Sequence, residues 1–265
     1  MLTNEWSFRL VDESRNLGGS KHSIDDDSGK LIVLTEDSPD SPTIYSDAIG
    51  ATAITETAGI GVVTFTNGHC RFFTASTVTA LDICGITADG RTFSLNSVGA
   101  NQQHMIPVNP LGGYQLLVVP FGASDNTETD TGLDLPAGCI LTADSIDFRV
   151  TGTDAGETVD AGILSSEANG DANGFIAAAS VATAGQVQLV PQITGGVNID
   201  YGSTAYIGAL LATIIAGADA VATVGGFTSK RYRTDGVAKS ITYTGSAGSD
   251  TAAGYMYVNF LRLPF

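Results

Sequence analysis

The chain has 265 residues, enough for one large or two smaller domains with a substantial core. Its 12 Lys and Arg against 28 Asp and Glu give a formal net charge of −16. Direct nucleic-acid binding is therefore not expected, because neutralising phosphates requires clustered Lys and Arg. The 32 Gly, the 15% of charged residues and the absence of sustained helical periodicity predict an all-β protein rich in turns.

Residues 1–44 are predicted to form an extended N-terminal arm. Most of this segment is polar, acidic and rich in turn residues, and its few apolar side chains include Trp6, Phe8 and Leu10. Aromatic anchors commonly dominate the binding energy of protein interfaces, whereas a free tail would leave such side chains exposed to water. We therefore expect Trp6, Phe8 and Leu10 to contact a partner protein or a neighbouring subunit, and an ordinary disordered terminus is the alternative.

Residues 45–132 are predicted to form a small β-domain. Short apolar or alternating segments follow one another, and Asn67-Gly68 and Asp89-Gly90 are typical turns of β-hairpins. The last strand of this domain is expected at 114–121. The following stretch, 124–132, is polar and acidic, so we interpret it as the linker to a second domain.

Residues 133–265 are predicted to form an antiparallel β-sandwich, jelly-roll-like, with Gly-rich turns between its strands. The alternating stretch 254–265 indicates a closing strand that ties this end of the chain into a sheet. Periodicity does not decide between a helical turn and a strand at 175–181. The predicted fold is thus all-β, with two β-domains and the N-terminal arm.

One uncharged segment, 202–218, invites comparison with a membrane span, which needs about 20 apolar residues. It is interrupted by Gly208 and Gly217 and ends at Asp219, so a buried strand is predicted and no membrane partner is expected. The start of the chain lacks the basic and apolar regions of a secretory signal.

The three cysteines, Cys70, Cys84 and Cys139, cannot all pair within one chain. An odd number without an export signal favours synthesis in a reducing cytoplasm. Buried free thiols are expected, and pairing of Cys70 with Cys84 across a hairpin is the alternative. The neighbours His69 and Cys70 are not expected to bind zinc together, because adjacent strand residues point to opposite faces.

No catalytic motif of a hydrolase, zinc protease or phosphate-binding loop occurs, so no enzymatic activity and no cofactor are expected. A glycosidase carboxylate pair stays open, because such pairs are defined by their separation in space. The stretch 169–174 (NGDANG) resembles the opening of a calcium loop, but Ser180 stands where the loop needs Glu, which favours a plain turn. The short runs 25–27 (DDD) and 230–233 (KRYR) are interpreted as solvated charge.

Four segments resemble structural proteins of tailed bacteriophages: 135–144 (LPAGCILTAD), 158–164 (TVDAGIL), 170–175 (GDANGF) and 240–258 (SITYTGSAGSDTAAGYMYV). The resemblance covers about the C-terminal half of the chain. It implies a virion component with a β-sandwich fold that is repeated many times in the particle, and it transfers no catalytic residue.

The expected function is therefore that of a capsid decoration, or cement, protein. It would be made in the host cytoplasm, lie on the outer capsid surface of the virion as a homotrimer, and bridge subunits of the major capsid protein. Trp6, Phe8 and Leu10 are then the candidate contacts with the capsid or with a neighbouring subunit. Two alternatives remain: a tail or head-fibre adhesin that binds host surface glycans, and a carbohydrate-active enzyme with dispersed carboxylates.

Overall fold

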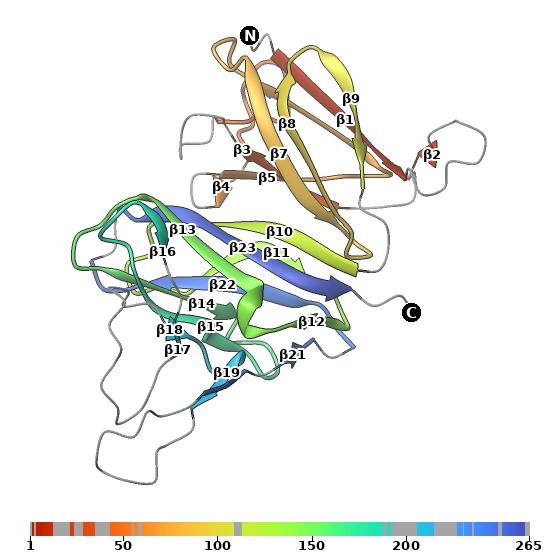
Figure 1. Cartoon of the computed structure of the whole chain (residues 1–265). Coiled ribbons are helices and arrows are strands. Elements are labelled where there is room, and N and C mark those ends of the chain that lie inside the picture. Colours follow the sequence, from red (N-terminus) through yellow and green to blue (C-terminus); the bar gives the residue numbers. More distant parts are fainter. Residues whose placement is uncertain are drawn as a thin grey trace, which may run out of the picture. The chain divides into compact units, whose positions relative to one another are not determined.

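The computed structural model describes residues 2, 4–12, 22–23, 29–34, 43–54, 56–57, 60–108, 113–187, 190–191, 206–214, 227–229, 231–234, 236–248 and 251–262. Within these ranges the regular structure consists of β-strands and one 3-10 turn, η2 (Ala143–Ser145), with no α-helix. The all-β prediction is confirmed. The chain divides into two compact units: unit 1 is Met1–Val118 with Arg262–Phe265, and unit 2 is Val119–Leu261 (Figure 1).

Unit 1 is a sandwich of two sheets. Its strands are β1 (Asn4–Asp12), β2 (His22–Ser23), β3 (Gly29–Leu34), β4 (Glu56–Thr57), β5 (Ile60–Thr64), β6 (His69–Thr74), β7 (Ala80–Thr87), β8 (Thr92–Gly99) and β9 (Gln102–Pro107). One sheet has the order β2-β1-β6, with β9 also paired to β1, and the other has the order β4-β5-β3-β7-β8. The β1–β9 pair is parallel, which differs from the purely antiparallel expectation.

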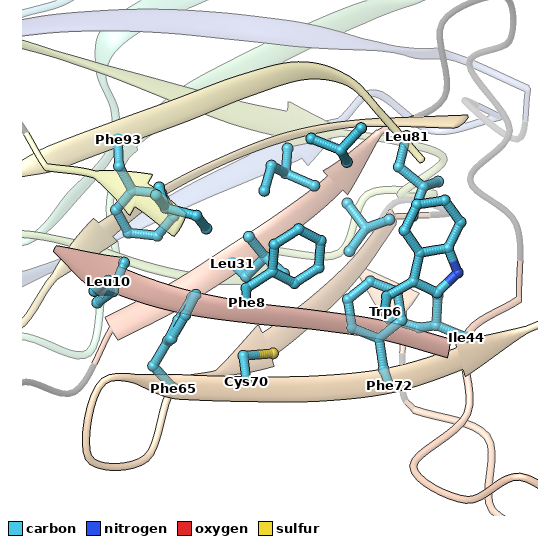
Figure 2. Close-up of a cluster of buried hydrophobic side chains, with 14 of the residues drawn as sticks. Trp6, Phe8, Leu10, Leu31, Ile44, Phe65, Cys70, Phe72, Leu81 and Phe93 are labelled. Atoms are coloured by element: carbon cyan, nitrogen blue, oxygen red, sulfur yellow. The ribbon is translucent and has the colours of Figure 1, made fainter. Parts of the chain in front are cut away.

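The core of unit 1 lies between these sheets. Strand alternation turns Trp6 and Phe8 of β1 inward, where both rings stack on Phe72 of β6, at centroid distances of 6.2 Å and 5.8 Å. Leu31 and Leu81, from β3 and β7 of the other sheet, belong to the same buried cluster (Figure 2). Apolar residues from both sheets thus hold unit 1 together.

The expected N-terminal arm is not what the structure shows for residues 4–12. Strand β1 pairs with β6 on one side and with β9 on the other, so it is an interior strand of its sheet. The side chains of Trp6, Phe8 and Leu10 are 0% exposed. They alternate with Ser7 and Arg9, which is the pattern of a strand with one face on the core. The aromatic side chains that were expected to contact a partner therefore pack within unit 1.

Both predicted hairpin turns are confirmed. Asn67 and Gly68 have φ of 51° and 70°, and the backbones of Thr66 and His69 bond reciprocally at 2.8 Å and 3.0 Å, as in a type I′ turn. Gly90, with φ of 83°, lies in the turn that joins β7 to β8. At these positions Asn and Gly supply the positive φ that other residues adopt only with strain.

Unit 2 is also a sandwich. Its strands are β10 (Gly113–Phe121), which begins in unit 1, β11 (Thr129–Leu135), β12 (Cys139–Leu141), β13 (Ile146–Gly152), β14 (Thr158–Ile163), β15 (Asp171–Ser180), β16 (Gly185–Val187), β17 (Val190–Pro191), β18 (Tyr206–Ile207), β19 (Ala212–Ile214), β20 (Phe227–Ser229), β21 (Tyr232–Arg233), β22 (Lys239–Gly245) and β23 (Ala253–Arg262). The main sheets have the orders β16-β13-β23-β12-β21, with β10 on β23, and β11-β22-β14-β15-β18-β17; β19 and β20 form a separate pair.

Aromatic contacts link the two main sheets of unit 2. Phe121 of β10 stacks on Phe148 of β13 at 4.5 Å and meets Tyr243 of β22, in the opposite sheet, edge-on at 6.3 Å. Phe175 of β15 meets Tyr232 of β21 in the same way at 5.8 Å. Each unit therefore has its own apolar core, as a sandwich requires.

The unit boundary differs from the expected division into 1–44, 45–132 and 133–265. It falls inside β10, between Val118 and Val119. The stretch interpreted as a linker belongs to unit 2, because Thr129 and Asp130 pair with β22. Asp125 and Asp130 are exposed, but Thr131 is fully buried and its hydroxyl donates a 2.7 Å hydrogen bond to the Ile241 carbonyl oxygen. Polar composition therefore resembled a linker where a strand begins.

Two segments of unit 2 were ambiguous in sequence. Residues 175–181 fall almost wholly within strand β15, since Ala177 and Ile176 pair with β18. The uncharged segment 202–218 contains the short strands β18 and β19 with a turn between them, where one strand was expected. Among the described residues, no helix has the length and apolar character needed to cross a membrane.

Candidate binding site

The outer face of one sheet in unit 2 carries a group of polar and aromatic side chains. In β13, Phe148 and Val150 are buried while Asp147 and Arg149 are exposed, and in β23 the buried Met256 alternates with half-buried tyrosines. This alternation follows from the two-residue period of a strand with one face on the core. The sequence therefore sends charge and aromatic rings to the same outer face.

Strand register brings these side chains together. Asp147 lies opposite Tyr257, and Arg149 lies opposite Tyr255 on β23 and opposite Gln186 on β16. Directly opposite residues of an antiparallel pair have Cβ atoms about 5 Å apart. The Tyr255 and Tyr257 rings, two residues apart on one strand, have centroids 6.5 Å apart. Figure 1 shows the three strands that carry this group, β13, β16 and β23.

A pocket of about 360 Å³ opens on this face. Its lining consists of Asp147, Phe148, Arg149, Gly185, Gln186 and Tyr257. Phe148 itself is fully buried, with its side chain in the core. The volume is near the lower end of the range for small-ligand sites, about 300–1,000 Å³. The pocket is thus large enough to hold a small ligand or part of a larger one.

The pocket offers hydrogen-bonding groups that the rest of the described chain leaves unused. Within the described ranges, the side chains of Asp147, Arg149 and Gln186 have no hydrogen-bond partner. The Asp147 carboxylate accepts, the Arg149 guanidinium donates, and the Gln186 amide does both. Their formal charges sum to zero, so the site is polar without being anionic or cationic.

The cysteines are buried structural residues. All three are free, as predicted. Burial raises the pKa of Cys70 to about 12, and burial together with the charge of Asp82 raises the pKa of Cys84 to about 12. Thiols with such pKa values stay protonated near neutral pH and are poor nucleophiles and poor metal ligands.

Of the two histidines with described side chains, His104 contributes to the fold of unit 1. The His104 ring stacks on Phe8 at 5.5 Å, and its Nε2 lies 2.7 Å from the Gly99 carbonyl oxygen. His69 is exposed at the end of the hairpin turn. No group of three or more His, Cys, Asp or Glu side chains with metal-binding geometry occurs among the described residues.

The glycines of the calcium-like stretch 169–174 are explained by packing. A Cβ atom on Gly170 would lie 2.1 Å from the Leu164 carbonyl oxygen, and one on Gly174 would lie 2.4 Å from Leu210. Strand β15 begins at Asp171, within the stretch. Of the two charge runs, 25–27 lies outside the described residues, as does Lys230.

Two buried cations have structural partners. Arg91 Nε lies 2.8 Å from Asp89 Oδ2 in the β7–β8 turn. Lys239 Nζ donates a 2.7 Å hydrogen bond to the Ala168 carbonyl oxygen and lies 3.8 Å from Glu167 Oε2. Glu167 Oε1 in turn accepts a 3.1 Å hydrogen bond from the Ser240 amide. These contacts join the 164–170 turn to strand β22.

Sequence reasoning placed the predicted contact residues in the wrong surroundings and missed the pocket. Trp6, Phe8 and Leu10 come together, but in the core of unit 1. The signal for the pocket was present in the closing strand, where Tyr255 and Tyr257 alternate with apolar residues. Its other members come from two distant strands, and only the register places them beside the tyrosines.

Comparison with known proteins adds little. No protein-family model matches the chain, and no curated protein matches it. Among solved structures, the major pilin SpaA of Corynebacterium diphtheriae is similar, with 10% identity and a TM-score of 0.24 over 98% of this chain. This chain spans 59% of the length of that pilin chain. A TM-score this low does not establish a shared fold.

Proposed function

We propose that the protein is a non-enzymatic structural protein of a tailed-phage virion, which decorates the outer capsid surface as a homotrimer and bridges subunits of the major capsid protein. The observation that carries the proposal is the sandwich architecture of unit 2, where the resemblance to phage structural proteins lies. The reactive side chains support it, since the thiols, His104 and the Arg91–Asp89 pair all serve the fold.

A decoration protein of this kind acts by avidity. A rigid module that contacts several capsid subunits at once makes local opening of the shell less favourable, without any chemical step. The net charge of −16 adds a preference for a basic surface on the partner, because complementary charge steers association and disfavours wrong partners.

The contact residues need to be exposed, so the buried Trp6, Phe8 and Leu10 are replaced as candidates. Tyr114 and Leu116 are 78% and 46% exposed and lie two residues apart on β10, hence on one face of that strand. Tyrosine is enriched among residues that dominate binding energy. We infer that Tyr114 and Leu116 contribute to the capsid contact.

The deciding experiment is co-sedimentation of the purified full chain with undecorated phage heads, after light scattering has given its oligomeric state. A trimer that saturates heads at a fixed stoichiometry is the expected result. The double variant Tyr114→Ala, Leu116→Ala should bind at least about tenfold more weakly. The variant Val237→Ala, at another exposed apolar residue, is the control and should bind as wild type does.

A chain that ignores heads and binds host cells would overturn the proposal in favour of the adhesin. Deletion of residues 1–44 is unsuitable as a test, because it removes the core strands β1 and β3. Loss of head binding after that deletion would report unfolding of unit 1.

A further inference from the structure

We propose that the pocket lined by Asp147, Arg149, Gln186 and Tyr257 in unit 2 binds a neutral saccharide. This inference goes beyond capsid decoration and does not depend on it. It rests on three features of the site: a half-buried aromatic ring, polar side chains without partners among the described residues, and zero net charge within a concave surface.

The aromatic component comes from β23. Tyr257 lines the pocket, and Tyr255 lies on the same face of the strand, with the two ring centroids 6.5 Å apart. Tyrosine combines an apolar ring face with a polar hydroxyl, which suits a ligand that is itself apolar on one face and polar at its edge. A pyranose ring has this form, with C–H bonds on its faces and hydroxyls around its rim.

The polar component matches hydroxyl groups. A sugar hydroxyl both donates and accepts, and the site offers the acceptor Asp147, the donor Arg149 and the amide of Gln186, which can do either. Arg149 lies between Gln186 and Tyr255 across three neighbouring strands, so donors, acceptors and a ring fall within one ligand's reach. These side chains lie on a three-stranded part of the sheet, which keeps their backbone positions fixed.

Charge selects a neutral ligand over an ionic one. An anionic ligand would meet Asp147 beside Arg149 and, at longer range, a chain with a net charge of −16. A cationic ligand would be repelled by Arg149, and Asp147 is the single carboxylate among the lining residues that could offset this repulsion. A neutral polyhydroxyl ligand uses both side chains and suffers neither repulsion.

Gly185 keeps one side of the pocket open. Its φ of +126° is a conformation that side-chain-bearing residues rarely adopt, and a Cβ atom built there would meet nothing within 4 Å. The glycine thus forms the turn into β16 and leaves space beside Gln186, where a further sugar unit of a longer chain would extend.

The test is binding of the full chain to neutral oligosaccharides, measured by calorimetry and by chemical-shift perturbation. The probes are maltohexaose, cellohexaose, a mannan hexasaccharide and N-acetylchitohexaose, with polygalacturonate as the acidic comparison. Saturable binding to at least one neutral probe, and weaker binding to the acidic one, is the expected result. A site of this size is expected to give a dissociation constant of about 0.1–1 mM.

Three variants connect binding to the pocket. Tyr257→Ala and Arg149→Gln should each weaken binding about tenfold or more, while Val237→Ala, at an exposed residue outside the pocket, should leave it unchanged. Circular dichroism checks that each variant is folded. Absence of saturable binding to all neutral probes, or binding that survives both pocket substitutions, would overturn the inference. Co-sedimentation of the Tyr257→Ala variant with phage heads tests the decoration proposal separately from saccharide binding.

Discussion

The indole Nε1–H of Trp6 donates a 2.9 Å hydrogen bond to Oγ1 of Thr74 within the core of unit 1. Both side chains are fully buried. The Thr74 hydroxyl in turn donates a 3.2 Å hydrogen bond to the Ala75 carbonyl oxygen. The single tryptophan of the chain is therefore fixed by a polar contact inside an apolar cluster, and it reports on the folding of unit 1.

Replacing Thr74 with Val should destabilise unit 1 by about 1–3 kcal/mol, because the shape is kept while the buried indole N–H loses its acceptor. Urea denaturation followed by Trp6 fluorescence measures the change. Thr74→Ser retains the hydroxyl and should lose less stability than Thr74→Val. If the Val variant were as stable as wild type, the Trp6–Thr74 bond would contribute nothing to unit 1.

Asp89 should contribute stability that is lost in acid. Burial alone would raise the pKa of Asp89, but hydrogen bonds from Arg91 and Thr87 and the charge of Arg91 outweigh it, so the pKa lies below its ordinary value. Stabilisation by a depressed carboxyl pKa is fully present above the unfolded value of about 3.9 and disappears as the pH falls through the folded value. Asp89→Asn should therefore cost about 1 kcal/mol at pH 7.

Denaturant midpoints at neutral pH and near pH 3 measure this effect. The difference between wild type and Asp89→Asn should shrink as the pH falls from neutral towards 3, because the unfolded chain takes up its proton first and the stabilisation from the depressed pKa decreases. Asp144→Asn is the matched control, because the exposed Asp144 side chain has no hydrogen-bond partner within the described ranges. An equal stability loss at both pH values would show that charge on Asp89 is not the cause.

The buried thiols should make the fold sensitive to alkali. Because burial raises the pKa of Cys70 and Cys84 to about 12, the folded chain keeps protons that the unfolded chain releases above about pH 8.5. Stability should therefore fall as the pH rises past that value. Cys84→Ala should show a shallower fall between about pH 8 and pH 10 than wild type, whatever its stability at pH 7.

Reactivity gives an independent measurement on the same thiols. A disulfide reagent such as dithiobis(nitrobenzoate) should leave Cys70 and Cys84 unmodified in the native protein and react with them after unfolding in guanidinium. Rapid modification of either thiol in the native state would contradict their burial.

The fold class could be predicted from local sequence, while the sheet neighbours could not. Asn67-Gly68 and Asp89-Gly90 specify their turns through backbone conformations that few residues adopt, so the hairpins were predictable. The parallel pairing of β1 with β9 joins segments almost a hundred residues apart, and no local pattern encodes it. Trp6, Phe8 and Leu10 were expected to pack on a partner, but the surface that buries them belongs to the chain itself.

The candidate site was hidden for the same reason. Tyr255 and Tyr257 showed an alternating strand, yet their significance depends on Asp147 and Arg149, which reach them only through the β13–β23 register. Gln186 lies on a strand of three residues, too short for periodicity to reveal. Sites assembled across a sheet need the register, which the core and the turns of the whole unit determine.

Close backbone packing between β14 and β15 gives a prediction for unit 2. A Cβ atom on Gly162 would lie 2.0 Å from the Asp171 carbonyl oxygen and 2.7 Å from the Gly174 amide nitrogen, and neither is the end of a flexible side chain. Gly162→Ala should therefore force the two strands apart and destabilise unit 2 by about 3 kcal/mol.

The matched control is Gly236→Ala, because a Cβ atom there meets nothing within 4 Å and Gly236 is exposed. Its stability should stay within about 0.5 kcal/mol of wild type. Near-ultraviolet circular dichroism of the tyrosines follows mainly unit 2, which holds six of the eight, while Trp6 fluorescence follows unit 1 in the same samples. If Gly162→Ala and Gly236→Ala unfolded at the same denaturant concentration, strands β14 and β15 would not be packed this closely.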